Sequence, residues 1–176
     1  MRWQLILFRL PAEPSRHRVA VWRELRRAGA VSIGQSVWLV PATPAFAESI
    51  ERAAELVARG GAEALVLDVG ATDEAGAERL AELYTAAREA EWEEFLSDCD
   101  GYLAELDHEV AIEKFTVAEL DEEEQSMERL RRWYRELRVR DVLGAPSAAT
   151  GEERLRICEA RLEAYTELVF KAVHQG

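Results

Sequence analysis

The chain has 176 residues, of which 48% are apolar and 32% charged, and its formal net charge is −12 at pH 7. This length and balance predict a globular protein with a buried core and exclude a disordered chain. No apolar run approaches the roughly 18–20 residues of a membrane span, and the apolar N-terminal segment is too short for a signal peptide, so we expect a cytoplasmic protein with no membrane partner.

The first 72 residues predict a small α/β domain. An apolar run closed by Pro11 and Pro14 is typical of a buried strand, Gly29 indicates the end of a helix, and Thr43-Pro44 indicates the start of another. In chain order we expect a strand at Trp3–Leu10, a helix at Ser15–Ala28 with Ser15 as its N-cap, strands at Ala30–Ile33 and Ser36–Val40, a helix from Pro44 to about Arg59, and a strand at Ala62–Val69. This β-α-β-β-α-β order is the ferredoxin-like arrangement.

Residues 73–176 predict helices alone. Apolar residues recur at spacings of three and four in three stripes, which is typical of amphipathic helices. Thr116 is a cap signal that predicts where the second helix starts. The three stripes are Tyr84, Trp92, Phe95, Cys99, Tyr102 and Leu106; Leu120, Met127, Leu130, Tyr134 and Leu137; and Leu155, Cys158, Leu162, Tyr165, Val169 and Ala172. We therefore expect an α+β protein, with a ferredoxin-like βαββαβ domain over residues 1–72 and a three-helix antiparallel region over residues 73–176. These helices can pack on each other, on the sheet domain or on a second copy, and we expect a homodimer.

Charge is distributed unevenly along the chain. Residues 1–30 carry seven arginines against Glu13 and Glu24, whereas residues 31–127 carry five basic and 24 acidic side chains. The net charge argues against nonspecific nucleic-acid binding, but the basic charge is localised. Such a distribution is typical of a protein with one anion-facing surface, although a well-solvated acidic middle segment explains it equally.

The first candidate site lies on the helix predicted after Pro14. A helix N-terminus offers unpaired N–H groups and a partial positive charge, which favour anions. Arg16, Arg23 and Arg27 share one face of this helix. The opposite face holds Val19, Trp22 and Leu25, and an arginine face opposite an apolar face suits contact with phosphates. Arginines paired with Glu13 and Glu24 on a solvated face explain the same spacing. The candidate DNA- or oxyanion-binding residues are Arg16, His17, Arg18, Arg23, Arg26 and Arg27.

A second basic face is predicted within residues 129–140. Leu130, Tyr134 and Leu137 are expected to face inward, which leaves the outward positions to arginines. Glu128 precedes Arg132 by four residues, the favourable order for a helical ion pair, so a salt-bridged surface helix is the alternative. The residues of this secondary basic face are Arg131, Arg132, Arg135 and Arg138.

The sequence predicts neither an enzyme nor a cofactor. Its three histidines have no metal-ligand spacing, and no nucleotide-binding or hydrolase motif occurs. Cys99 and Cys158 form no CxxC pair and are expected to be core thiols, and the acidic run at Glu119–Glu124 is explained by the helix macrodipole without a metal. We therefore expect a regulatory or binding protein.

Sequence blocks along nearly the whole chain are similar to a known family. They are Trp3–Leu7, Leu10–Arg23, Ser36–Pro41, Phe115–Leu120 and Arg140–Pro146. Together they resemble ChrB, the chromate-resistance regulators. The opening block is also distantly similar to the domain that phenylacetate-degradation repressors share with CRISPR-adaptation nucleases. The acidic residue that those nucleases need on the first strand is missing here.

The resemblance implies a chromate-responsive transcriptional regulator whose N-terminal arginines contact DNA: Arg16, Arg18 and Arg23 first, then Arg26 and Arg27. Full-length members continue into a second domain associated with chromate resistance, and this sequence ends at Gly176 without it. We therefore expect a stand-alone N-terminal module. The alternative is a protein-interaction or dimerisation module that binds neither DNA nor chromate.

Overall fold

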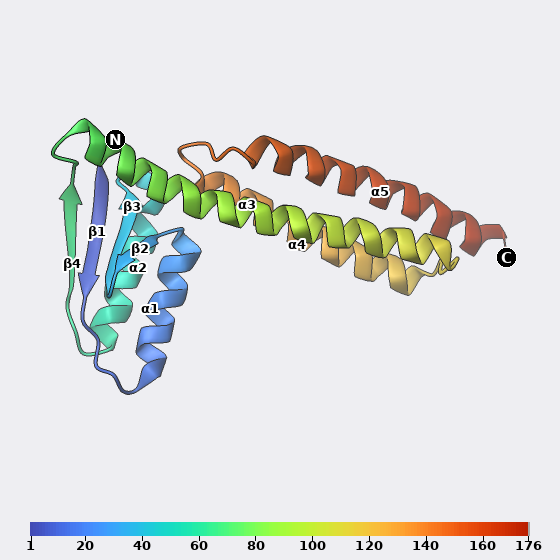
Figure 1. Cartoon of the computed structure of the whole chain (residues 1–176). Helices are drawn as coiled ribbons and strands as arrows, with labels where there is room; N and C mark the ends of the chain where they lie inside the picture. The colour runs from blue at the N-terminus through green and yellow to red at the C-terminus, as the bar shows by residue number, and fades with distance from the viewer. Residues whose placement is uncertain (176) are drawn as a thin grey trace. The chain divides into compact units, whose positions relative to one another are not determined.

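The computed structural model describes residues 1–175 and divides into two compact units, Met1–Ala87 and Arg88–Gly176 (Figure 1). We call the first the sheet unit and the second the helical unit. The domain boundary predicted after residue 72 stays a prediction. Within the described residues, no helix combines the length and the apolar character that crossing a membrane requires.

The elements follow one another as strands and helices in the first part of the chain and as helices alone in the second. Their bounds are β1 Trp3–Phe8, α1 Ser15–Ala28, β2 Val31–Gly34, β3 Val37–Pro41, α2 Pro44–Arg59, β4 Ala64–Val69, α3 Glu74–Ala111, α4 Val117–Arg140 and α5 Ala148–Gln175. The predicted α+β class is confirmed.

Three of the predicted helix boundaries can be compared with the observed caps. Gly29 ends α1 with a φ of 81°, a left-handed conformation that glycine adopts without strain. The Thr116 hydroxyl caps α4 by accepting a hydrogen bond from the Glu119 amide at 3.3 Å. The prediction that Ser15 caps α1 is wrong, because Pro14 occupies the N-cap position and no side chain bonds to the first turn.

The four strands form an antiparallel sheet in the order β2-β3-β1-β4. Side chains alternate between the two faces, so Ile6, its partner Trp38 on β3, and Phe8 share one face. Figure 1 shows α1 and α2 on one side of the sheet. On the opposite face, the Trp3 ring packs against Tyr84 of α3, with ring centroids 5.6 Å apart.

Helix α1 packs through only part of its predicted apolar face, because Leu25 is buried but Val19 and Trp22 are not. Its buried residues are Val21, Leu25 and Ala28. Val19 and Trp22, which the pattern places on the apolar face, are 41% and 47% exposed. The reason is that α1 packs against α2, so its buried stripe is turned toward that helix.

In the helical unit, α4 runs antiparallel to α3 and α5 runs antiparallel to α4 (Figure 1). All three predicted stripes contribute to one core. Two assignments differ: Tyr84 packs in the sheet unit against Trp3, and Ala172 is exposed. The buried core residues are Trp92, Phe95, Cys99, Tyr102, Leu106, Met127, Leu130, Leu137, Ala145, Ala148, Leu155, Cys158, Leu162, Tyr165 and Val169.

The connection between α4 and α5 is tied to α3 by hydrogen bonds. The Trp92 indole N–H donates to Asp141 Oδ2 at 2.9 Å. The same carboxylate accepts from the backbone N–H groups of Gly144 and Ala145 at 3.0 and 2.9 Å. Glu89 accepts from the Ser147 N–H at 2.9 Å, directly before the first turn of α5. The bonds to Asp141 satisfy backbone donors of the connecting loop, and the bond from Ser147 satisfies a donor at the start of α5.

Helix α5 approaches α3 closely at Gly151. A Cβ atom at this position would lie 2.7 and 2.8 Å from two carbons of the Trp92 ring, so only glycine fits beside the indole. Further along the same pair of helices, Cys99 and Cys158 are fully buried, and the Cys158 thiol lies 3.7 Å from the Cys99 carbonyl oxygen. The hydrogen bond to Cys158 and burial raise the pKa of the Cys99 thiol. The prediction of core thiols is confirmed.

Candidate nucleic-acid interface

The basic residues predicted near the N-terminus all lie on α1. Arg16, Arg23 and Arg27 share one face because they are seven and four residues apart. All five arginines of the group are exposed, and His17 is half-buried. We call this group of side chains on α1 the α1 basic face: Arg16, His17, Arg18, Arg23, Arg26 and Arg27.

Not all of these arginines are equally available to a ligand. Arg27 forms an ion pair with Glu24 at 2.6 Å, and Arg52 of α2 contacts the same carboxylate at 3.3 Å. The Arg26 guanidinium lies 5.1 Å from the centroid of the Trp22 ring, a cation–π distance. Arg18 and Arg23 form no ion pair within residues 1–175. Arg27 thus forms the predicted ion pair with Glu24, and the other arginines of α1 remain exposed outside that pair.

Helix α1 carries more positive than negative charge. Glu24 is its only acidic residue, and that carboxylate is already shared between Arg27 and Arg52. The first turn contains no acidic side chain that would neutralise the N-terminal end of the helix dipole. The arrangement therefore favours contact with an extended polyanion more than with a cation or a neutral surface.

The second predicted basic face lies on α4 in the helical unit, and much of its charge is paired. Arg131 contacts Glu159 at 2.8 Å, and Arg135 contacts Glu128 at 3.0 Å. The predicted ion pair between Glu128 and Arg132 is not the one observed, because Glu128 contacts Arg131 and Arg135 instead. Arg132 and Arg138 are exposed and form no ion pair in the described part of the chain.

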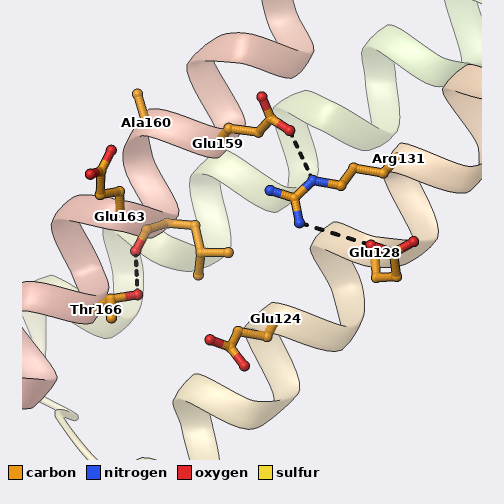
Figure 2. Close-up of a pocket in the computed structure, with 8 residues that line it drawn as sticks. Glu124, Glu128, Arg131, Glu159, Ala160, Glu163 and Thr166 are labelled. Carbon is orange, nitrogen blue, oxygen red and sulfur yellow. Dashed lines mark hydrogen bonds and ion pairs between the residues drawn. The ribbon is translucent and has the colours of Figure 1, made fainter.

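A groove between α4 and α5 has the opposite charge. Its cavity of about 680 Å³ is lined by four glutamates around Arg131, which extends between Glu128 and Glu159 (Figure 2). The carboxylates are Glu124, Glu128, Glu159 and Glu163. These four carboxylates outweigh the single charge of Arg131, so the groove repels phosphate. Among residues 1–175, no group of three or more acidic, histidine or cysteine side chains has a geometry that could hold a metal ion.

One carboxylate that the sequence pattern missed is buried between α3 and α4. Glu123 is only 6% exposed and lies within the apolar stripe of α4. Burial raises its pKa, and the nearby carboxylates Glu105, Glu109, Glu119 and Glu122 raise it further. Lys114 is the cation of this region, with its ammonium nitrogen 2.8 Å from Glu119 and 3.6 Å from Glu109. The hydrogen bond with Glu119 raises the Lys114 pKa.

We expect Glu123→Gln to stabilise the protein at neutral and alkaline pH. A carboxyl group whose pKa is higher in the folded state favours folding when protonated, and this contribution is lost as pH rises through the folded pKa. Glutamine stays uncharged at every pH, so the variant avoids this loss. The Tm of Glu123→Gln should therefore exceed that of the parent protein by an amount that increases from pH 4.5 to pH 8. Thermal unfolding across this range measures it. Glu136→Gln, the same change at an exposed position of α4, should show no such growth.

Comparison with known proteins identifies the chain. A family model described as "Protein ChrB, N-terminal" matches residues 18–176. The chain belongs to the ChrB N-terminal family. The match includes Arg18, Arg23 and the α4 arginines, whereas Arg16, His17 and the block at Trp3–Leu7 precede it. No curated protein matches the chain.

Proposed function

We propose that this protein is a non-catalytic, cytoplasmic transcriptional regulator of the chromate-resistance type that contacts DNA through the α1 basic face. The observation that carries the proposal is the exposure of Arg18 and Arg23 without ion-pair partners in the described residues, on a helix whose single carboxylate is already occupied. Membership of the ChrB N-terminal family supports a role in chromate resistance. The strand order supports a ferredoxin-like domain as the scaffold that presents α1.

The charge distribution explains how such a protein would restrict its binding. The acidic middle of the chain repels phosphate, while the arginines of α1 attract it, so a duplex can approach favourably from the side of α1. Contacts to phosphates position the protein, and specificity requires further contacts to base edges. In the proposal an oxyanion such as chromate competes with phosphate for the same guanidinium groups.

Fluorescence anisotropy with DNA from upstream of the protein's own gene tests this function, across a salt series and with and without chromate. Each phosphate contact contributes about 0.9 to the slope of log K against log salt, so Arg16→Gln/Arg23→Gln should lower that slope by about 2. The control is Arg59→Gln/Arg156→Gln, which removes the same charge from exposed arginines that pair with Glu55 and Glu153. Equal effects of the two double variants would contradict a defined contact surface.

A protein-interaction module is the second candidate. It is favoured by Phe170 and Val173, which are 58% and 51% exposed near the end of α5. Such exposed apolar side chains are typical of an assembly surface when they cluster. A homodimer by light scattering that is indifferent to Arg16→Gln/Arg23→Gln, together with no DNA binding at low salt, would favour this function over the first.

A further inference from the structure

A pocket opens between the start of α1 and the ends of β1 and β3. Its volume is about 330 Å³, at the lower end of the range for small-molecule sites. The rings of Phe8, Trp22 and Trp38 and the side chain of Val19 provide its apolar walls. All of these residues belong to the sheet unit.

The pocket exposes apolar surface that packing within the sheet unit does not cover. Trp38 is only 8% exposed, whereas Trp22 and Val19, on α1, are 47% and 41% exposed. These two are the residues that the helical pattern assigns to the apolar face and that α1 turns away from its buried stripe. Because burying an aromatic ring removes a large apolar area from water, a flat ring placed between Trp22 and Trp38 would be stabilised.

The polar groups of the pocket favour an anion. Arg18 is the charged residue of its lining, Ser36 adds a hydroxyl group, and no carboxylate lines the pocket. The Arg26 guanidinium, 5.1 Å from the Trp22 ring centroid, adds positive potential nearby. The α4–α5 groove is the contrasting case, because its four glutamates would exclude the same ligand.

We propose that this pocket binds a small planar aromatic carboxylate, with its ring against Trp22 and Trp38 and its carboxylate on Arg18. A guanidinium group holds a carboxylate through two parallel hydrogen bonds, which orients the ring as well as binding the charge. Binding at this site does not depend on the proposed function. One consequence rests on that function: a bound carboxylate occupies Arg18 and removes one cation from the α1 basic face.

The test uses two ligands of nearly equal shape, 2-naphthoate and the uncharged 2-naphthamide, titrated into the full chain by calorimetry and protein NMR. We expect saturable binding of naphthoate, with shifts of the indole N–H signals of Trp22 and Trp38 and none for Trp92 and Trp133. Arg18→Gln should weaken naphthoate binding about tenfold and leave naphthamide binding unchanged, since it removes a charge-assisted hydrogen bond.

Arg23→Gln is the matched control, because it removes the same charge from α1 at a residue that does not line the pocket. It should leave naphthoate binding nearly unchanged. Equal affinities for naphthoate and naphthamide, equal losses in the two variants, or no saturable binding would each overturn the proposal. Failure of DNA binding in the anisotropy experiment leaves this result unaffected, so the two proposals are tested separately.

Discussion

Replacing Trp92 with alanine is expected to lower the free energy of unfolding by about 3–5 kcal/mol, the cost of truncating a large buried aromatic side chain. Trp92 is fully buried, and its ring lies 5.8 Å from Phe95 and 5.7 Å from Tyr134 between centroids. Alanine would leave a cavity at the junction of α3, α4 and the start of α5, and would remove the hydrogen bond to Asp141. Denaturant unfolding followed by circular dichroism at 222 nm measures the change.

Trp22→Ala is the control for residue type, because Trp22 is 47% exposed and lines an open pocket. Its loss should cost about 1 kcal/mol or less, as is usual for a partly exposed side chain. A Trp92→Ala protein that unfolds at the same denaturant concentration as Trp22→Ala would show that the helical core does not depend on this ring.

Replacing Asp141 with alanine is expected to cost about 2–4 kcal/mol, because several donors lose their acceptor at once. The carboxylate accepts from the Trp92 indole and from the backbone N–H groups of Gly144 and Ala145 at 2.9–3.0 Å. With alanine, the indole N–H would remain inside the protein without this partner. Asn should lose less, because its single oxygen keeps part of the acceptor capacity. Equilibrium unfolding in urea compares the three proteins.

A double-mutant cycle separates the indole bond from the loop bonds. Trp92→Phe removes the N–H and keeps an aromatic ring, so Asp141→Ala should cost about 1 kcal/mol less in that background. Asp121→Ala, an exposed aspartate of α4, should change stability by no more than about 0.5 kcal/mol. Full additivity of Trp92→Phe and Asp141→Ala would contradict an energetic link between α3 and the loop.

The sequence predicts element type and order well where local chemistry determines them. Gly29 ends α1 because its left-handed conformation suits glycine, and Thr116 starts α4 because its hydroxyl caps the first turn. The apolar stripes predict most of the helical core. Periodicity alone does not determine which side of α1 is buried, because packing against α2 leaves Trp22 exposed.

The candidate sites depend even more on contacts between distant residues. Arg131 pairs with Glu159, 28 residues later, and the aromatic pocket joins side chains from β1, α1 and β3. Neither can be read from spacing within one helix. Burial of Glu123 is equally unpredictable, because a carboxylate amid an acidic run is typical of a solvated surface. The sequence does indicate that the α1 arginines are exposed. Their role in binding DNA or an oxyanion stays a prediction.

The close approach of α5 to α3 limits how this sequence can change over time. Gly151 has no side chain, and the Trp92 ring occupies the space where one would be. A larger residue at position 151 requires a smaller one at position 92, and a smaller one at 92 leaves Asp141 without its indole donor. Three positions on two helices and a loop are therefore tied together, so that substitutions at them can be accepted as a set and are disfavoured one at a time.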